Sequence, residues 1–490
     1  TRSLCDWSSD VCSSDLILVR IVKAFFSENF EKQTRLIPYD MRPKGAEVPF
    51  RCCIYKERAI LKDRVIAGLG FAIEDDDETV SLSEYAEKSL ERKEPEKNPL
   101  TVLGAACKAC VPKRIHVTDL CQGCVARPCV STCKFGAIEI VNGHSVIDST
   151  KCKACKMCIN ACPYNAIVKV AVPCEDNCPV SAIEKNEDGT AKIDFDKCIT
   201  CGRCVSKCPF GAVHEKSQLI EVLKLLKAEK ELTLMFAPAV VGQFPGTIGQ
   251  LKSAMKKVGF THVYEVAQGA DVTIKNEAKE LEERLDEGQP FMTTSCCAGY
   301  NQFTKKHLPE IEQYKSDTKT PMFYTAEIAK REHPNSINIF VSPCVAKKQE
   351  AFENENVDYV LNTAELGALF IGLHIEITNY EEETSEVEPS KQGRNFPVTG
   401  GVAEAVKFCA GCETRPVAIN GLNKDSIRQL KKYAQTGNCE EGNLVEVMCC
   451  EGGCIGGNAT ISDERTAKKL IKTLLDNSGD IEKNPTKEKQ

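Results

Sequence analysis

The stretch CITCGRCVSKCP, residues 198–209, places four cysteines at the spacing C-x2-C-x2-C-x3-C and follows the last one with a proline. The stretch CKACKMCINACP, residues 152–163, repeats this spacing. Three cysteines so close together hold one 4Fe–4S cube, and the fourth reaches a neighbouring cube. Structural zinc, which is held by four ligands, is the alternative. A repeat of eight cysteines at this spacing is hard to explain by zinc binding. The two runs therefore predict cluster binding.

Two incomplete copies of the pattern accompany the complete ones. One has the spacing C-x2-C-x4-C-x3-C from Cys121 to Cys133, and the other keeps only Cys174 and Cys178. After the fourth cysteine of each copy a related stretch returns: FGAIEI, YNAIVKV, VSAIEK and FGAVHE. Four repeats predict two α+β ferredoxin-like modules, which pair their cysteines across repeats.

The predicted cluster ligands divide into sets of four. The first module has two sets: Cys121, Cys124, Cys129 and Cys162, then Cys152, Cys155, Cys158 and Cys133. The second module completes one set with Cys198, Cys201, Cys204 and Cys178. Cys174 and Cys208 lack two partners, which the upstream pair Cys107 and Cys110 can supply. This fourth cluster is a hypothesis; the alternative is that Cys107 and Cys110 bind nothing and the second module carries one cluster.

Composition narrows the class of protein. The chain has 490 residues, 42% hydrophobic and 27% charged, with a net charge of −7, so neither nucleic acid nor an anionic membrane is an expected partner. No apolar run approaches the roughly 20 residues that span a bilayer. Twenty-nine cysteines, many at C-x-x-C spacing, favour metal ligation over disulfides. We expect a cytoplasmic location, where thiols stay reduced.

Three segments of the second half carry further cysteines: TSCCAGY (294–300), SPCVAKKQE (342–350) and EVMCCEGGCIGGN (446–458). Two of them follow apolar runs, INIFV and NLVEV, as expected where strands of an open α/β sheet end in functional loops. Neighbouring side chains of an extended segment point to opposite sides. Cys296 and Cys297 are therefore not expected to hold one metal ion together.

These segments resemble, in order, the signature segments TSCCPxW, MPCxxKxxE and ExMxCxGGCxxGGG of iron-only (FeFe) hydrogenases, over about residues 232–460. The resemblance implies two lobes of parallel sheet flanked by helices, with the H-cluster between them. That cofactor is a 4Fe–4S cubane bridged by one cysteine to a diiron unit with CO, cyanide and a dithiolate. By the motifs, the cubane ligands would be Cys297, Cys344, Cys450 and Cys454, and Cys454 would be the bridge.

The same resemblance assigns roles near the diiron unit. Cys296 would relay protons to the dithiolate, since a thiol both donates and accepts hydrogen bonds; a buried structural thiol is the alternative. Lys347 would bind a cyanide ligand, and Glu350 would orient Lys347 or an adjoining loop. Lys348 is expected to be an exposed charge.

Further positions align with the family. Ala237 and Pro238, in APAV, resemble the segment that packs over the diiron ligands, and Met448 matches the methionine of the third motif.

A proton path is also implied. The stretch TIKNEAKELEERL resembles the family segment with two path glutamates, here Glu277 and Glu280, which are neighbours on one helical face. Ser316 aligns with the path serine. The expected route is Glu280, Ser316, Glu277, Cys296; the alternative for each glutamate is a solvated helix face.

The chain departs from the family pattern at five positions: Ala298, Tyr300, Ser342, Cys449 and Asn458 stand where Pro, Trp, Met, a small residue and Gly are usual. The proposed ligands, Cys296 and Lys347 are all retained, so we expect a divergent hydrogenase. Five further cysteines have no assigned role: Cys52, Cys53, Cys409, Cys412 and Cys439.

The domain organisation follows. Residues 1–16, TRSLCDWSSDVCSSDL, resemble a translated sequencing adapter, so we expect the natural N-terminus to be missing. A mixed α/β segment and linker (17–100), two ferredoxin-like modules (101–217), an α/β catalytic domain (218–476) and a polar tail (477–490) are expected to follow.

The expected activity is the reversible reduction of protons to H2. Electrons would pass through the 4Fe–4S clusters from soluble ferredoxin or a similar carrier, and maturation proteins would install the diiron site. The alternatives are a non-catalytic relative of the eukaryotic iron–sulfur assembly factors, a redox or H2 sensor, and a plain electron-transfer protein.

Overall fold

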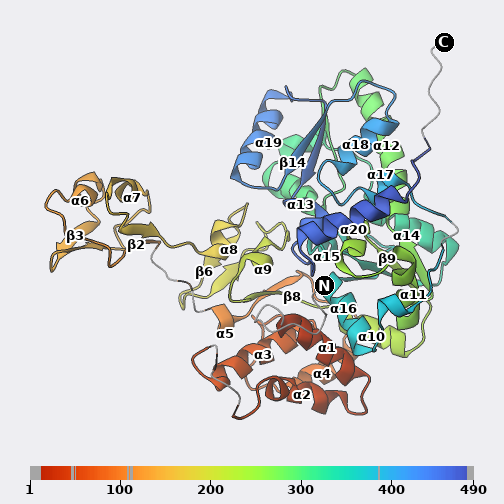
Figure 1. Cartoon of the computed structure of the whole chain (residues 1–490), viewed down its shortest axis with the longest axis horizontal. Coiled ribbons are helices and arrows are strands. Elements are labelled where there is room, and N and C mark those ends of the chain that lie inside the picture. The colour runs from red at the N-terminus through yellow and green to blue at the C-terminus, as the bar shows by residue number, and fades with distance from the viewer. Residues whose placement is uncertain are drawn as a thin grey trace.

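The computed structural model describes residues 13–45, 49, 51–107, 110, 114–384 and 387–482. A helical unit, two small ferredoxin-like modules and a larger α/β region follow one another along the chain, and the first module projects away from the rest (Figure 1). Within the described part, no helix is long and apolar enough to cross a membrane.

The first unit is helical. Its elements are α1 (Ser13–Phe25), α2 (Phe30–Met41), α3 (Ile54–Gly68) and α4 (Leu82–Glu91). The prediction of a mixed α/β segment at residues 17–100 is wrong. In the described part before Leu100 all elements are helices, and α3 starts at Ile54, directly after Cys53, with no strand before it. Leu61, Val65 and Leu69 recur at helical spacing and are buried against α1. The adapter-like segment lies mostly outside the described residues, but its last four residues begin α1.

Each ferredoxin-like module contains two antiparallel strand pairs and two short helices. The first contains β2 (Ile115–Val117), α6 (Pro128–Thr132), β3 (Ile138–Val141), β4 (His144–Ile147), α7 (Met157–Ala161) and β5 (Ile167–Lys169). In it, β2 pairs with β5 and β3 with β4.

The second module borrows a strand from upstream. It contains α8 (Pro173–Asp176), β6 (Ile183–Lys185), β7 (Ala191–Ile193), α9 (Arg203–Lys207) and β8 (Val213–Glu215). Strand β6 pairs with β7, and β8 pairs with the upstream β1 (Leu100–Val102). Helix α5 (Gly104–Cys107) follows β1 directly, which brings Cys107 to the second module.

The α/β region contains two parallel sheets. The first has the order β10-β9-β12-β13, with β9 (Leu232–Phe236), β10 (His262–Glu265), β12 (Ile337–Val341) and β13 (Tyr359–Leu361). The second has the order β11-β15-β14, with β11 (Met292–Thr293), β14 (Pro416–Asn420) and β15 (Leu444–Met448). Every residue of β9 and β15 is buried, as expected for parallel strands covered on both faces.

Helices flank these sheets. They are α10 (Leu219–Lys227), α11 (Ile248–Val258), α12 (Ala267–Asp286), α13 (Ala298–His307), α14 (Pro321–Glu332), α15 (Ala346–Ala351), α16 (Thr363–Gly372), α17 (Lys391–Arg394), α18 (Gly401–Cys409), α19 (Lys424–Thr436) and α20 (Glu464–Asp476). Short 3-10 turns are η2 (Pro238–Gln243), η3 (Pro309–Tyr314), η4 (Ile377–Asn379) and η5 (Cys454–Gly456).

The segment after α20 is not wholly a free tail. The backbone N–H of Lys391 donates to the carbonyl of Gly479, the N–H of Ile481 donates to the side chain of Gln392, and Ile481 is buried. The chain therefore packs against α17 as far as residue 482, while residues 483–490 lie outside the described part.

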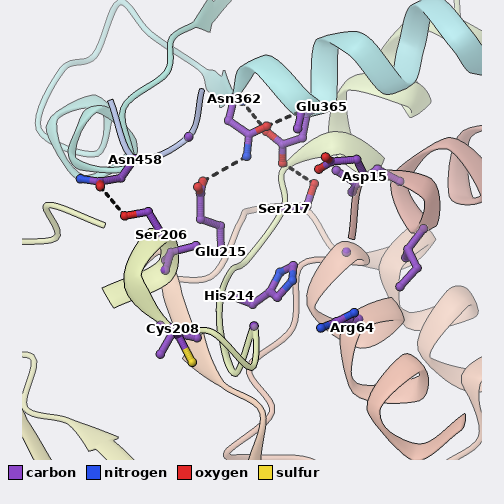
Figure 2. Close-up of a pocket in the computed structure, with 18 of the residues that line it drawn as sticks. Asp15, Arg64, Ser206, Cys208, His214, Glu215, Ser217, Asn362, Glu365 and Asn458 are labelled. Atoms are coloured by element: carbon purple, nitrogen blue, oxygen red, sulfur yellow. Dashed lines mark hydrogen bonds between the residues drawn. The ribbon is translucent and has the colours of Figure 1, made fainter. Parts of the chain in front are cut away.

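A cavity of about 310 Å³, lined by both polar and apolar residues, lies where the helical unit, the second module and the α/β region meet (Figure 2). Its lining includes Arg64, Cys208, His214 and Glu215. Burial, with the positive charges of Arg64 and Lys348, lowers the pKa of His214 to about 3, so this imidazole is neutral at neutral pH.

The expected exposure of Lys348 is wrong. Its side chain is 1% exposed, and its ammonium lies 3.3 Å from Glu215 and 3.4 Å from Glu365. It also donates to the carbonyl of Lys216. Position 348 is on α15, and the side chain crosses to the second module, so this cation joins the module to the α/β region.

Replacement of Lys348 by alanine leaves two buried carboxylates without their cation. We expect Lys348→Ala to lower the free energy of unfolding by about 3–5 kcal/mol. The measurement is urea unfolding of the anaerobic, cluster-loaded protein, in which the variant should unfold at a lower urea concentration. Lys468→Ala is the control, because Lys468 is exposed and pairs with Glu464 one turn away on α20. Equal midpoints for the two variants would contradict this role.

Candidate active site and cluster sites

A mostly apolar cavity of about 90 Å³ lies at the carboxyl ends of strands from both sheets. Strand β9 leads into Ala237 and Pro238, β12 into Ser342 and Cys344, β11 into Cys296 and Cys297, and β15 ends at Met448; all of these residues line the cavity. The carboxyl ends of parallel strands are the usual place for a functional site. The three cysteine motifs, far apart in sequence, thus meet at one place.

The four predicted cubane ligands come together there. Cys344, Cys450 and Cys454 lie close enough to Cys297 for their charges to interact. Burial raises the pKa of Cys344 to about 12 and raises the pKa of Cys450 and of Cys454 above its ordinary value. Four such thiols cannot all ionise in one buried place without a cation, and iron supplies that positive charge. The donor set therefore fits a cubane.

Two glycines allow the third motif to fold back. Gly452 and Gly453 have φ values of 80° and 83°, which glycine adopts without strain. A Cβ on Gly453 would lie 2.4 Å from the carbonyl oxygen of Pro397. Only glycine fits the close approach that turns the chain from Cys450 to Cys454.

Cys297 has a polar neighbour that the sequence did not reveal. A hydrogen bond with the thiol of Cys449 lowers the pKa of Cys297 to about 6, against the opposing effect of burial. Cys449 is one of the departures from the family pattern, and it lies beside Cys297 in the folded chain. The substituted thiol therefore stabilises the ionised form of a predicted ligand.

Cys296 is buried and lines the cavity. Burial, with the nearby carboxylates of Glu277 and Glu446, raises its pKa well above the ordinary value. The side chain is therefore a neutral thiol between the cavity and Glu277, which is the position that a proton relay requires.

Lys347 also lines the cavity. Its ammonium donates to Glu350 at 2.7 Å, and the hydroxyl of Thr320 donates to the other oxygen of Glu350 at 2.5 Å. Burial acts to lower the pKa of Lys347, but the carboxylate of Glu350 outweighs it and raises that pKa. Glu350 thus contacts both Lys347 and Thr320, the residue that precedes α14, so this geometry supports both expected roles, the orientation of Lys347 and of an adjoining loop.

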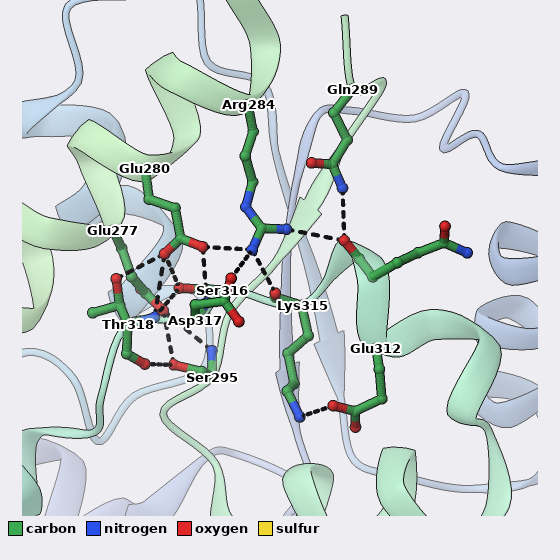
Figure 3. A network of polar contacts seen from close by, with 11 residues as sticks. Glu277, Glu280, Arg284, Gln289, Ser295, Glu312, Lys315, Ser316, Asp317 and Thr318 are labelled. Carbon is green, nitrogen blue, oxygen red and sulfur yellow. Dashed lines mark hydrogen bonds and ion pairs between the residues drawn. The ribbon is translucent and has the colours of Figure 1, made fainter. Parts of the chain in front are cut away.

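The predicted path residues form a connected network (Figure 3). Ser316 donates to Glu280 at 2.6 Å, and Ser295 donates to Glu277 through its backbone N–H at 3.1 Å. The hydroxyl of Ser295 donates to the carbonyl of Thr318, and the hydroxyl of Thr318 donates to Glu280, which connects the two glutamates; Ser316 lies close enough to Glu277 to affect its pKa. The alternative of a solvated helix face is wrong for Glu277, which is fully buried.

The pKa values of the two glutamates are shifted in opposite directions. Burial raises the pKa of Glu277 to about 7. Partial burial of Glu280 acts in the same direction, but hydrogen bonds from Ser316, Asp317 and Thr318, with the charge of Arg284, lower its pKa overall. Glu277 can therefore take up and release a proton near neutral pH, whereas Glu280 is a carboxylate at rest and can hold a proton only transiently.

We expect Glu277 to titrate near pH 7. Below that pH the carboxyl is neutral, and above it the carboxylate forms, because burial raises the folded-state pKa above the ordinary value of 4.5. The stabilising effect of its protonation is complete below about pH 4.5 and is lost as pH rises through 7. Infrared difference spectra between wild type and Glu277→Gln should show a protonated carboxyl band at pH 5 that disappears with a midpoint near 7.

The control is Glu283→Gln, which changes an exposed carboxylate of the same helix and should leave the band in place. A band that persists at pH 9, or that is missing at pH 5, would contradict this assignment.

The two predicted cluster sets of the first module surround two separate hollows. One is lined by Cys121, Cys124, Cys129 and Cys162. The other is lined by Cys133, Cys152, Cys155 and Cys158. Each hollow thus takes its fourth cysteine from the other repeat, as the sequence predicts.

The remaining two sets also assemble. Cys204 lies near Cys198, Cys201 and Cys178. Cys110 lies near Cys107 and Cys208, and Cys174 near Cys208 and Cys110. This proximity favours the hypothesis of a fourth cluster over the alternative in which Cys107 and Cys110 bind nothing.

The repeated alanine explains part of the internal repeat. The backbone N–H groups of Ala137, Ala182 and Ala212 donate to the sulfurs of Cys133, Cys178 and Cys208 at 3.4, 3.2 and 3.4 Å. Hydrogen bonds to cluster sulfurs help to set the reduction potential. Three of the four repeats therefore aim one amide at the last cysteine of their motif.

The second module is fastened to the cavity region by side chains that the sequence did not single out for this role. Arg203 donates to the carbonyls of Leu422 and Cys449, both at 2.9 Å. Asn458 donates to the carbonyl of Cys201 at 2.8 Å and to the sulfur of Cys450 at 3.5 Å. A glycine at position 458 cannot make these bonds. Cys201 belongs to the second module, 257 residues away in sequence, so no local pattern indicated its contact with Asn458.

The cysteines without an assigned role stay separate from these sites. Cys409 and Cys439 are buried, Cys412 is half-buried, and Cys52 and Cys53 lie in the helical unit.

Comparison with known proteins shows the class of protein to which this chain belongs. Residues 230–458 match the family model described as iron only hydrogenase large subunit, C-terminal domain. Residues 145–168 match a 4Fe-4S binding domain, and residues 168–219 an LdpA Fe-S cluster-binding domain.

Individual relatives specify the protein family further. The chain is 30% identical over 372 residues to the periplasmic [Fe] hydrogenase large subunit of Nitratidesulfovibrio vulgaris, which covers 64% of this chain and 85% of that protein. It is 29% identical over 380 residues to iron hydrogenase 1 of Clostridium pasteurianum. The aligned region covers 64% of this chain and 64% of that protein. It is also 23% identical over 274 residues, 41% of this chain and 58% of the other, to the cytosolic Fe-S cluster assembly factor NAR1 of Kluyveromyces lactis.

The protein is thus an iron–sulfur protein of the hydrogenase class. The chain belongs to the iron-only hydrogenase family, with ferredoxin-like modules before the family domain. The predicted cofactors, 4Fe–4S clusters and an H-cluster, are confirmed by this membership together with the cysteine sets.

Proposed function

We propose that this chain is a hydrogenase that interconverts protons, electrons and H2 at the cavity between the two sheets. The convergence of Cys297, Cys344, Cys450 and Cys454 beside Cys296 and Lys347 is the observation that carries the proposal. On this proposal, residues 101–217 conduct electrons, residues 218–476 carry out the reaction, and the two parallel sheets correspond to the two lobes of the family.

The residues of the chain have distinct tasks. The H-cluster, when bound, supplies the redox chemistry that joins electrons to protons. Cys297, Cys344, Cys450 and Cys454 hold it, while Lys347, fixed by Glu350, offers an ammonium to an anionic ligand in the cavity. Ala237, Pro238 and Met448 line the walls and exclude water, which strengthens the electrostatic interactions inside.

Protons follow a separate route on this proposal. Glu280 receives a proton near the surface, Ser316 passes it to Glu277, and Glu277 exchanges it with the thiol of Cys296. A pKa near 7 suits Glu277 to this exchange, because a relay works best when its proton affinity matches the working pH.

The similarity to an assembly factor gives the main alternative, a protein that binds clusters without turnover. Retention of Cys296, Lys347, Glu277 and Glu280 in one connected site favours catalysis, since binding of a cubane alone requires none of them. A sensor of H2 or redox state would share this site, and turnover separates it from an enzyme. A soluble ferredoxin-like carrier and diiron maturation proteins are the proposed partners, in the cytoplasm.

Infrared spectroscopy of anaerobically matured protein tests the function. We expect stretching bands of CO and cyanide together with H2 turnover when a reduced small-molecule donor is supplied. Cubane signals without these bands would support the assembly-factor alternative, and bands with negligible turnover would support a sensor.

Replacement of Cys296 tests the relay. We expect Cys296→Ala to keep the infrared bands and to lose about 10²–10⁴-fold of turnover, the usual contribution of a positioned acid–base group. Cys409→Ala is the matched control, because Cys409 is a buried cysteine of the same core but does not line the cavity. Full turnover in Cys296→Ala would remove this thiol from the mechanism.

A further inference from the structure

Two histidines and a glutamate meet at the end of the first sheet that lies opposite the active-site cavity. Glu231 directly precedes β9, His262 is the first residue of β10, and His333 caps the carboxyl end of α14. Candidate ligand atoms of the three side chains all lie within 4.8 Å of one another. Because β9 and β10 are parallel, this group lies at their amino ends, whereas the cavity lies at their carboxyl ends. None of the three residues has a task in the proposed function.

Glu231 and His262 already have nearly the spacing of two ligands on one metal ion. Nε2 of His262 lies 3.0 Å from a carboxylate oxygen of Glu231. Zinc holds imidazole nitrogen and carboxylate oxygen at about 2.0–2.2 Å in tetrahedral geometry, so two such ligand atoms lie about 3.4 Å apart. A zinc ion can therefore take the place of the proton between these two atoms, while the imidazole keeps a proton on Nδ1.

The third side chain lies across the face of the first imidazole. The ring centroids of His262 and His333 are 3.4 Å apart, and the ring planes differ by 10°. Tyr264, on β10, meets the His333 ring at 64° with the centroids 6.1 Å apart, and the hydroxyl of Tyr264 donates to Glu332 at 2.5 Å. Parallel rings do not aim their nitrogens at one point, so metal binding requires one ring to rotate out of this stack.

The backbone at all three positions is held by regular structure. The carbonyl of Glu231 accepts from the N–H of Ile337, and His262 lies within the β9–β10 ladder. The N–H of His333 donates to the carbonyl of Ala329 in the last turn of α14 at 2.8 Å. Sites built on strands and helices are positioned more precisely than sites on loops. Only a side-chain rotation therefore separates the observed arrangement from a ligand set.

The group is open to solvent, and its chemistry selects a class of ion. The side chains of His262 and Glu231 are 25% and 44% exposed, so an ion can reach them. Two imidazoles with one carboxylate suit zinc, whereas calcium and magnesium take mainly oxygen ligands. Three protein ligands leave the fourth tetrahedral position for a water molecule. With both imidazoles neutral, as ligation requires, the carboxylate offsets part of the charge of the ion.

We propose that Glu231, His262 and His333 bind one zinc ion, which links β9, β10 and α14 at the end of the sheet opposite the cavity. The ion is held by two nitrogens and one oxygen and by no sulfur, which distinguishes this site from every cysteine set of the chain. It fastens the carboxyl end of α14, whose amino end contributes Pro321 and Met322 to the cavity wall. An ion that binds only the folded chain stabilises it.

Equilibrium dialysis of the anaerobic, cluster-loaded full chain against radioactive zinc ions tests the proposal. We expect one bound ion per chain that depends on these residues. His262→Ala and His333→Ala should each weaken its binding at least about tenfold, since even residues that only orient a ligand contribute about that much. Glu231→Gln should also weaken binding, because it keeps the size of the side chain and removes its charge.

X-ray absorption at the zinc edge separates this site from binding to thiols. With one equivalent of zinc, we expect nitrogen and oxygen neighbours at about 2.0–2.1 Å and no sulfur at about 2.3 Å. Cys52→Ser with Cys53→Ser removes two unassigned cysteines of the helical unit, one of them exposed, and should leave this ion bound. Sulfur neighbours in the wild type, or loss of the ion in the Cys52 and Cys53 variant, would overturn the proposal.

The matched control is His374→Gly, which removes an exposed imidazole at a position where φ is 58° and glycine fits without strain. This variant should bind zinc as the wild type does, and zinc should raise the urea midpoint of both but not that of His262→Ala. Equal zinc affinity in the wild type and His262→Ala would overturn the proposal, as would a wild type that binds no zinc. Neither measurement depends on H2 chemistry, so the proposed function is tested separately.

Discussion

Buried thiols that must ionise together are the constraint on which this structure depends. Cys297, Cys344, Cys450 and Cys454 come from three distant segments and are packed where water is largely excluded. Such a group is electrostatically unfavourable without iron and favourable with it. The two parallel sheets provide the solution, because their strands end at one place and deliver the three segments to it.

The same constraint recurs in the ferredoxin-like modules, where it is met by a different means. Their strands are only three or four residues long, and cysteines share the interior with aliphatic side chains. Bound clusters take the place of a large hydrophobic core, as metals commonly do in small domains. The second module is further held by β1, by the buried Lys348 and by Arg203, which ties it to the α/β region.

The departures from the family pattern gather around one edge of the active site. Cys449 contacts Cys297, Asn458 contacts Cys450 and the backbone of Cys201, and Tyr300 is buried with its hydroxyl bonded to Thr293. Three of the five substitutions thus have polar partners in the folded chain, and the other two, Ala298 and Ser342, line the cavity. Residues around the ligands tune a metal centre, so these positions distinguish this chain from relatives with the usual residues.

The sequence by itself predicted the cluster-binding modules and the grouping of most of their cysteines, because a cubane imposes short, regular spacings between its ligands that are visible in the sequence. It indicated the three segments of the candidate active site through resemblance to the family. It also indicated the path residues Glu277, Glu280 and Ser316 through resemblance. It did not determine that the described elements between residues 17 and 99 are all helices, that Lys348 is buried, or that Asn458 contacts the second module. Those features depend on packing and on contacts between residues distant in sequence, such as Asn458 and Cys201, and only the tertiary structure decided them.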